Sequence, residues 1–251
     1  MQRYFVTPDQ MTDSHATITG EDVKHISKVM RMTSGDHLIV CDNQTRVAVC
    51  AVDEITDSAV ELSIEKWLDE QTELPIYVTI AQGLPKHDKL EMIVQKGTEL
   101  GANQFIPFHA SRSIVKWDRK KGKKKTERLQ KIIKEAAEQS HRSRIPKCSE
   151  PVPFKELLTL SDSYTIKIIA YEEEAKANET AKLANLFSTA DISNDRVFVI
   201  IGPEGGLTEE EVTVLQAAGF ITCGLGPRIL RTETAPLYVL SAISYQFELS
   251  R

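Results

Sequence analysis

Two glycine- and proline-bearing stretches near the C-terminus hold the residues whose types and spacing could do chemistry. The first, Ile201-Gly-Pro-Glu-Gly-Gly206, follows an apolar run and precedes a helix start at Thr208-Glu-Glu-Glu211. Glycines let backbone approach a ligand closely, and a helix start presents free N–H groups. Its acidic first turn disfavours a phosphate. We therefore expect a ligand with little negative charge, such as an adenosine that bears a sulfonium.

The second stretch is Leu225-Gly-Pro-Arg-Ile-Leu-Arg-Thr-Glu-Thr-Ala-Pro236. A loop of this length inside a compact domain is usually functional. We expect its backbone to hold the adenine, and Arg231 and Glu233 to face the reacting centre. In the alternative it is an ordinary connection in which Arg231 pairs with Glu233. A third loop, after Ala170-Tyr171, begins Glu172-Glu-Glu-Ala175 and indicates little by itself.

Alternating strands and helices must position these loops. Apolar runs predict strands at 76–81, 104–108, 165–171, 196–201 and 220–225. Helical periodicity predicts helices at about 86–100, 125–141, 208–218 and 235–248. This alternation predicts a parallel sheet covered on both faces. Ligands of such sheets bind beyond the carboxyl ends of the strands.

The N-terminal part has a different pattern. Short strands are predicted at 2–6, 37–41, 46–52 and 59–64, with one helix that begins near Gly20. They favour a small β-barrel or sandwich. The polar segment 68–75 ends in proline and is typical of a linker. We therefore predict two domains, residues 1–70 and 74–251.

Several functional classes lack their motifs. The four cysteines form no Cys-x-x-Cys pair and the six histidines show no ligand spacing, so we expect no metal. Neither a Gly-x-Gly-x-x-Gly turn nor a Gly-x-x-x-x-Gly-Lys-Ser/Thr loop occurs, which argues against a Rossmann enzyme and against nucleotide hydrolysis. Without an apolar run that could span a membrane or act as a signal peptide, we expect a cytoplasmic protein.

Charge is unevenly distributed along the chain. The net charge is −5, yet residues 109–147 carry 14 Lys and Arg against 4 Asp and Glu. Such a basic segment is either an electrostatic footprint for a nucleic acid or a solvated lysine surface.

Six fragments in order resemble the 16S rRNA uracil-N3 methyltransferases of the SPOUT superfamily. They span the chain: Arg3-Tyr-Phe, His25-Ile-Ser-Lys-Val-Met-Arg31-Met, Gln95-Lys-Gly-Thr-Glu-Leu-Gly101, Glu138-Gln-Ser-His-Arg-Ser-Arg144, and the two stretches described above. The resemblance implies an N-terminal PUA-like β-barrel that helps to hold RNA. It also implies an α/β domain with a C-terminal trefoil knot, and a homodimer to which helix 235–249 contributes.

The same resemblance implies S-adenosylmethionine as cofactor. Its contacts, carried over by motif, would be Ala170, Tyr171, Ile201, Gly202, Pro203, Gly206, Leu225, Gly226, Ile229, Leu230 and Arg231. The implied substrate is a uridine of 16S rRNA within the assembled small ribosomal subunit. Two alternatives stay open: a related knotted enzyme acting on tRNA or on a ribose 2′-hydroxyl, and a non-catalytic RNA-binding protein of ribosome assembly.

Methylation at uracil N3 sets two tasks, loss of the N3 proton and stabilisation of charge on the flanking carbonyl oxygens. Arg231 is our candidate for the second, because guanidinium is a permanently charged donor fork. Glu233 or water would accept the proton, although a carboxylate of normal pKa is a weak base. Lysines 120, 121 and 123–125 would attract phosphates without specificity. The predicted RNA contacts are Arg3, Lys24, Arg31, Arg112, Arg142 and Arg144.

Overall fold

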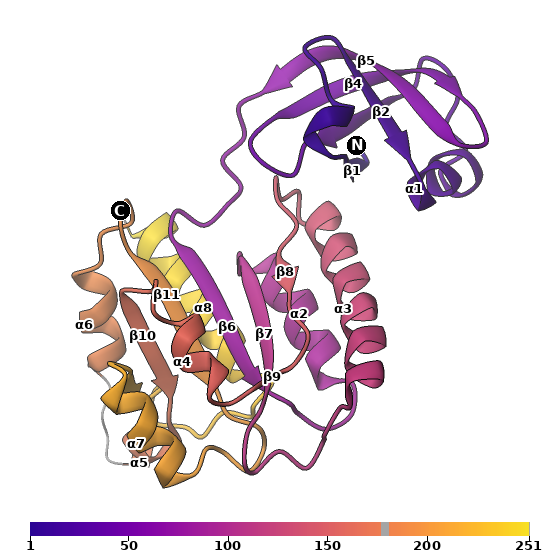
Figure 1. Ribbon diagram of the computed structural model, residues 1–251. Helices are drawn as coiled ribbons and strands as arrows, with labels where there is room; N and C mark the ends of the chain where they lie inside the picture. Colours follow the sequence, from indigo (N-terminus) through magenta and orange to yellow (C-terminus); the bar gives the residue numbers. More distant parts are fainter. Residues whose placement is uncertain (177–180, 251) are drawn as a thin grey trace. The chain divides into compact units, whose positions relative to one another are not determined.

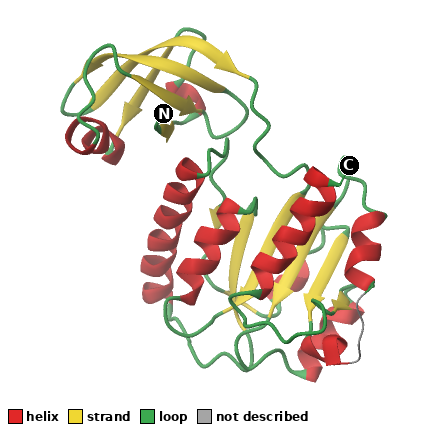
Figure 2. Ribbon diagram, turned by 180° about the vertical axis from the view of Figure 1, so that it is seen from behind, coloured by secondary structure: helices red, strands yellow, loops and turns green. Residues whose placement is uncertain are grey.

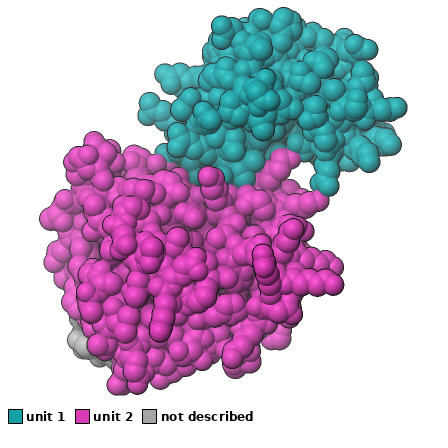
Figure 3. Space-filling view, viewed as in Figure 1, with its two compact units in different colours: residues 1–73, 137–145 teal, residues 74–136, 146–251 magenta. Residues whose placement is uncertain are grey.

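The computed structural model describes residues 1–176 and 181–250, which form two compact units (Figure 3). Unit 1 comprises Met1–Glu73 and Ala137–Ile145, and unit 2 comprises Leu74–Ala136 and Pro146–Arg251. The nine-residue stretch 137–145 therefore belongs with the N-terminal part of the chain, although a long piece of unit 2 precedes it. No helix among the described residues is long and apolar enough to cross a membrane.

Unit 1 is built on one five-stranded sheet. Its strands are β1 (Arg3–Phe5), β2 (His15–Thr19), β3 (His37–Cys41), β4 (Val47–Ile55) and β5 (Ala59–Leu68), in the order β1-β3-β4-β5-β2. Only the β1–β3 pair is parallel. The described residues of unit 1 form no second sheet, so the sandwich alternative is wrong. Strand β2 was missed because its five residues carry only one large apolar side chain, Ile18.

Short helices complete the N-terminal part of unit 1. They are the 3-10 turn η1 (Pro8–Gln10), helix α1 (Glu21–Lys24) and the π-helical turn η2 (His25–Val29). Val23 and Ile26 are buried against the sheet, while Val29 and Met30 stay exposed at the end of the turn. The predicted helix near Gly20 is therefore present, but its second half is wound as a π-helix.

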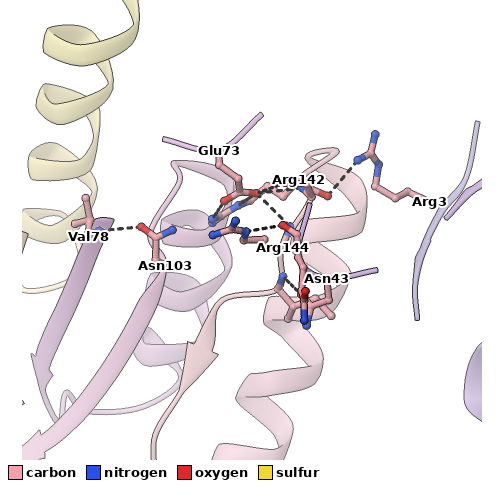
Figure 4. Close-up of polar contacts among 10 residues, drawn as sticks. Arg3, Asn43, Glu73, Val78, Asn103, Arg142 and Arg144 are labelled. Carbon is pink, nitrogen blue, oxygen red and sulfur yellow. Dashed lines mark hydrogen bonds and ion pairs between the residues drawn. The ribbon is translucent and has the colours of Figure 1, made fainter. Parts of the chain in front are cut away.

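The stretch 137–145 is fastened to unit 1 by apolar and ionic contacts. Ala137 and Ile145 pack in a cluster with Phe5, Ile39 and Cys41. Figure 4 shows the polar part, in which the buried Arg142 guanidinium pairs with Glu73. Other bonds of this group include Arg3 Nη1 to the Arg142 carbonyl at 3.2 Å, Arg144 Nε to the Gln44 carbonyl at 2.7 Å, and Ile145 N–H to Asn43 Oδ1 at 2.7 Å.

Unit 2 has the predicted parallel sheet. Its strands are β6 (Tyr77–Gly83), β7 (Gln104–His109), β8 (Lys147–Cys148), β9 (Val152–Pro153), β10 (Ile166–Ala170), β11 (Arg196–Ile201) and β12 (Ile221–Cys223). The order is β12-β10-β11-β6-β7-β8, and β9 also pairs with β7. Every pairing is parallel. The central strands are buried on both faces, as their continuous apolar runs indicated.

Helices cover both faces of this sheet (Figures 1 and 2). They are α2 (Lys89–Glu99), α3 (Arg119–Gln139), α4 (Glu156–Leu160), α5 (Glu172–Lys176), α6 (Lys182–Ser188), α7 (Glu209–Ala217) and α8 (Ala235–Ser244), with the π-helical turn η3 (Tyr245–Leu249). Helices α4 and α7 pack on one face, in a cluster with Phe108 and Phe198. Helices α2 and α8 meet on the other face, where Gly97 makes room for Phe105.

Two expectations about local structure are wrong. Helix α3 begins at Arg119 and not near Lys125, because the Asp118 carboxylate accepts a hydrogen bond from the Lys121 N–H at 2.8 Å and so helps to start the helix. The lysine-rich segment is therefore helical. The segment after Tyr171, expected to be a loop, forms helix α5. Helices α4 and α6 were not predicted, since five and seven residues give too little periodicity.

Candidate cofactor site

The carboxyl ends of strands β10, β11 and β12 open into one pocket of about 440 Å³ in unit 2. Both stretches singled out in the sequence line it, together with Ala170 and Tyr171 at the end of β10. All of the expected cofactor contacts line the pocket except Gly226. The parallel register explains this convergence, because Ala170 pairs with Ile201 and with Cys223, so that the three strands end side by side.

The glycine loop that follows β11 is shaped by two glycines with different physical roles. A Cβ on Gly83, at the end of β6, would lie 2.6 Å from Pro203 Cδ, so only glycine lets that strand approach the loop. Gly206 has φ +67°, a conformation that side-chain-bearing residues rarely adopt. The turn then enters α7 through the predicted capping box, in which Thr208 Oγ1 accepts from the Glu211 N–H at 3.2 Å.

A buried amide ties the glycine loop to the loop 225–236. Gln82 Nε2, at the end of β6, donates to Thr232 Oγ1 at 2.9 Å, and the Thr232 hydroxyl donates to the Gly202 carbonyl at 2.6 Å. Both side chains are buried. The two loops that form most of the pocket are thus held to the same strand of the sheet.

The wall of the pocket also carries an ion-pair cluster. Lys89 Nζ lies 3.0 Å from Glu204 Oε1 and 3.0 Å from Glu233 Oε2. These ion pairs raise the pKa of Lys89, chiefly the contact with Glu204 and then the one with Glu233. Burial raises the pKa of Glu233, but bonds from its own backbone and from Lys89 outweigh burial and hold the pKa below its ordinary value. The same balance, with Lys89 and the Lys86 N–H as donors, lowers the pKa of Glu204.

These contacts bear on the two residues expected to face the reacting centre. Both Arg231 and Glu233 line the pocket, and Arg231 is exposed to solvent there. Glu233 is paired with Lys89, which makes its carboxylate a weaker proton acceptor than a free one. Sequence reasoning missed Lys89, Glu204 and Thr232. A signal was available for Lys89, which follows the carboxyl end of β6 within a few residues.

The six expected RNA contacts lie in different environments. Lys24, Arg31 and Arg144 are exposed on unit 1. The side chains of Arg3 and Arg142 are buried in unit 1, where Arg3 pairs with Glu70. Arg112 of unit 2 lines the pocket, and its Nη1 donates to the carbonyls of Gly205 and Leu207, each at 3.2 Å.

Comparison with known proteins decides the family. A model of the RNA methyltransferase domain matches residues 72–244, and a model of the RNA methyltransferase PUA domain matches residues 18–65. The chain belongs to the RNA methyltransferase family. It is 50% identical to ribosomal RNA small subunit methyltransferase E of Bacillus subtilis, over 100% of this chain and 99% of the relative.

Solved structures agree with that family and with the fold. A crystal structure described as a hypothetical protein is 49% identical and superposes with a TM-score of 0.92, over the whole of both chains. Ribosomal RNA small subunit methyltransferase E from Neisseria gonorrhoeae, bound to S-adenosyl methionine, is 25% identical with a TM-score of 0.84 over 98% of each chain. The expected fold, a PUA-like domain followed by a SPOUT-type α/β domain, is therefore confirmed.

Proposed function

We propose that this methyltransferase transfers a methyl group from S-adenosylmethionine to N3 of a uridine in 16S rRNA, within the assembled small ribosomal subunit. The main support for the proposal is the pocket at the carboxyl ends of β10, β11 and β12, which Arg231 lines beside the expected cofactor loops. The named activity of the Bacillus subtilis relative supports the substrate class. A protein acting on ribosomal subunits works in the cytoplasm.

The pocket fits S-adenosylmethionine in size and in chemistry. Its volume of about 440 Å³ lies within the range of small-molecule sites. The apolar side chains of Ile201, Leu225 and Leu230 line it beside glycine backbone. The acidic turn Glu209–Glu211 at the start of α7 makes a phosphate unfavourable and leaves an adenosyl group acceptable. When bound, the cofactor supplies an electrophilic methyl group on a sulfonium.

The protein's own residues then assist proton loss and charge stabilisation. Uracil N3 loses its proton to solvent, and its electron pair forms the bond to the methyl carbon. The methyl–sulfur bond would break at the same time and leave its electron pair on the thioether sulfur. We assign the proton to bulk solvent, in an equilibrium that precedes methyl transfer, because the Glu233 carboxylate is already engaged by the Lys89 ammonium. The exposed Arg231 guanidinium donates to a carbonyl oxygen of the base, where negative charge gathers as the proton leaves.

Nucleoside mass spectrometry tests the reaction. Purified small subunits and, separately, tRNA are incubated with the protein and S-adenosylmethionine, then digested to nucleosides. We expect 3-methyluridine from the small subunits only. A methylated tRNA nucleoside or a 2′-O-methyl product would favour the related knotted enzymes instead. No product together with no calorimetric binding of millimolar cofactor would favour a non-catalytic assembly protein.

Replacement of Arg231 tests its role. Removal of one charge-stabilising donor in an active site typically slows turnover about 100-fold to 1000-fold. We expect Arg231→Ala to lose turnover on small subunits to about that degree, and Arg231→Lys to recover only part of it, because ammonium lacks the planar donor fork. Wild-type turnover by Arg231→Ala would contradict the assignment.

The proposed RNA-binding surface consists of exposed cations. Lys24, Arg31 and Arg144 are exposed cations that suit phosphate contacts, whereas we leave the buried Arg3 and Arg142 out of the RNA surface. Arg112 is included where it lines the pocket.

The protein also forms a homodimer through α8 and η3, which expose Tyr238, Tyr245 and Leu249.

A further inference from the structure

The ammonium group of Lys89 links three parts of the pocket wall, which are helix α2, the glycine loop and the loop 225–236. Lys89 is the first residue of α2, and its Nζ lies 3.0 Å from one carboxylate of the glycine loop and 3.0 Å from one of the loop 225–236. All three side chains are partly shielded, with exposed fractions of 27% for Lys89, 29% for Glu204 and 13% for Glu233. The cation therefore acts on both carboxylates at once.

Charges around the pocket balance only when Lys89 is counted. The cations of the lining are Lys89, Arg112, Arg228 and Arg231. The carboxylates of the lining are Glu172, Glu173, Glu204 and Glu233, equal in number to the cations. In the loop before α2, Lys86 and Asp88 offset each other. Without Lys89 the lining would have a net charge of −1, and the excess would sit on the two carboxylates that Lys89 now neutralises.

This balance matters for a reaction that makes the substrate anionic. A uracil that loses its N3 proton becomes negatively charged on N3 and on its two carbonyl oxygens. Nearby unpaired carboxylates disfavour that anion and so raise the pKa of the N3–H. A cation between them removes the penalty without competing with Arg231 for the base.

We propose that Lys89 is a positioning residue that neutralises Glu204 and Glu233, so that uracil N3 can lose its proton near neutral pH in this pocket. The inference rests on the proposed methylation of uracil N3. The two 3.0 Å contacts of Lys89 Nζ with the glutamates support it, and the direction of the Lys89 pKa shift agrees with them. The pKa of Lys89 is raised by its bonds to the two glutamates, so the ammonium stays charged over the working range of pH.

A series of variants that differ in the net charge of the pocket lining tests the inference. Single-turnover rates with small subunits and saturating S-adenosylmethionine are measured from about pH 6 to pH 10, since such rates isolate the chemical step. Lys89→Met gives the lining a net charge of −1, Glu204→Gln gives +1, and the double variant returns it to zero. Lys89→Arg is the control that keeps the charge.

The expected readout is the midpoint of the acid limb of the rate profile. One unit charge at about 7 Å in a partly shielded site shifts a midpoint by roughly 0.5 to 1.5 pH units. We expect a shift to higher pH for Lys89→Met, a shift to lower pH for Glu204→Gln, and midpoints close to that of the wild type for the double variant and for Lys89→Arg. At pH 7 the Lys89→Met rate should fall about 3-fold to 30-fold.

Other outcomes would overturn the inference. If all variants kept one midpoint and lost rate equally at every pH, Lys89 would only hold the loops in place. Loss of cofactor binding by Lys89→Met in calorimetry, with an unmoved midpoint for Glu204→Gln, would lead to the same conclusion. If the wild type formed no 3-methyluridine, the proposed function would fail first, which the mass spectrometry distinguishes from a failure of Lys89 alone.

Discussion

The Arg142 side chain has a different role in the structure from the one that the sequence suggested. Arg142 lies in a basic fragment and was expected to contact RNA, yet its side chain is only 3% exposed and pairs with Glu73. The same carboxylate accepts the Ser143 N–H at 3.0 Å and the Arg144 N–H at 3.2 Å. Glu73 thus has its acceptor sites filled by three successive residues, and it anchors the stretch 137–145 within unit 1.

Breaking this pair should destabilise unit 1. Arg142→Met leaves the Glu73 carboxylate shielded and without its cation, which typically costs about 3–5 kcal/mol of unfolding free energy. Urea denaturation followed by Trp67 emission in a Trp117→Phe background measures it, because Trp67 lies in unit 1 and Trp117 in unit 2. Arg128→Met of unit 2, followed by Trp117 emission in a Trp67→Phe background, is the matched control. Its pair with Glu91 is 65% exposed on the arginine side, so its loss should cost less than about 1 kcal/mol. Equal stability of Arg142→Met and the control would contradict the structural role.

Sequence reasoning at the level of single residues succeeded for backbone positions and failed for side-chain pairings. Gly206 is recognisable because its positive φ favours glycine whatever surrounds it, and Gly202 because a Cβ there would lie 3.0 Å from the Gly206 carbonyl carbon. The pairing of Lys89 with Glu204 and Glu233 joins residues more than a hundred positions apart, and no local pattern records it. Arg3 was likewise indistinguishable from a surface cation until its burial was known.

At the scale of elements, the positive charges at the start of α3 lower the stability of the helix but suit the binding of a polyanion. Arg119, Lys120 and Lys121 occupy its first turn, where the helix dipole disfavours positive charge. Only Asp118, just before the helix, offsets them locally. These exposed cations therefore cost stability where they stand, which is the pattern expected of residues kept for binding a polyanion.

Neutralising these lysines should strengthen the fold and weaken RNA binding. Lys120→Gln with Lys121→Gln should stabilise unit 2 by about 0.3–1 kcal/mol per residue in urea denaturation. Further replacement of Lys123, Lys124 and Lys125 by glutamine should lower RNA affinity and reduce the slope of log K against log salt by about 0.7–0.9 per lost phosphate contact. A control variant neutralises the exposed Lys66 and Lys155, which lie outside α3. An unchanged salt slope would identify the start of α3 as a solvated surface.

The elements themselves were predictable to the extent that apolar periodicity marks them. Strands 37–41 and 196–201 have the bounds that the sequence indicated, because apolar runs flanked by polar residues define them. The first turns of α3 contain no apolar periodicity, only basic residues and one glycine, so the pattern placed the helix start too late. Helix α5 was missed because three glutamates followed by alanine look like a polar loop.

At the scale of the whole molecule, chain connectivity sets what the sequence can reveal. A boundary near residue 70 follows from a polar, proline-ended segment. The return of 137–145 to unit 1 could not be predicted, because it depends on contacts with Phe5 and Ile39 far along the chain. The trefoil knot stays a prediction from resemblance, since periodicity carries no information about threading.

The exposed face of α8 and η3 is the surface on which assembly can be tested. Tyr238, Tyr245 and Leu249 are spaced by seven and four residues, so they share one side of the helical segment, with exposed fractions of 40%, 63% and 73%. This face adjoins the loop 225–236, because a Cβ placed on Gly226 would lie 3.5 Å from the Tyr238 hydroxyl. A two-fold axis through it would bring two pockets close to the interface.

Charge placed on this face should separate the subunits. We expect the wild type to sediment as a dimer at micromolar concentration, and the double variant Tyr245→Glu with Leu249→Glu to sediment as a monomer, because buried carboxylates would face each other across the axis. The monomer should also bind S-adenosylmethionine more weakly in calorimetry, since the loop at Gly226 would lose its support. The control Ile114→Glu changes a residue 73% exposed elsewhere on unit 2 and should leave the dimer intact. A monomeric wild type, or a dimeric double variant, would exclude α8 and η3 as the interface.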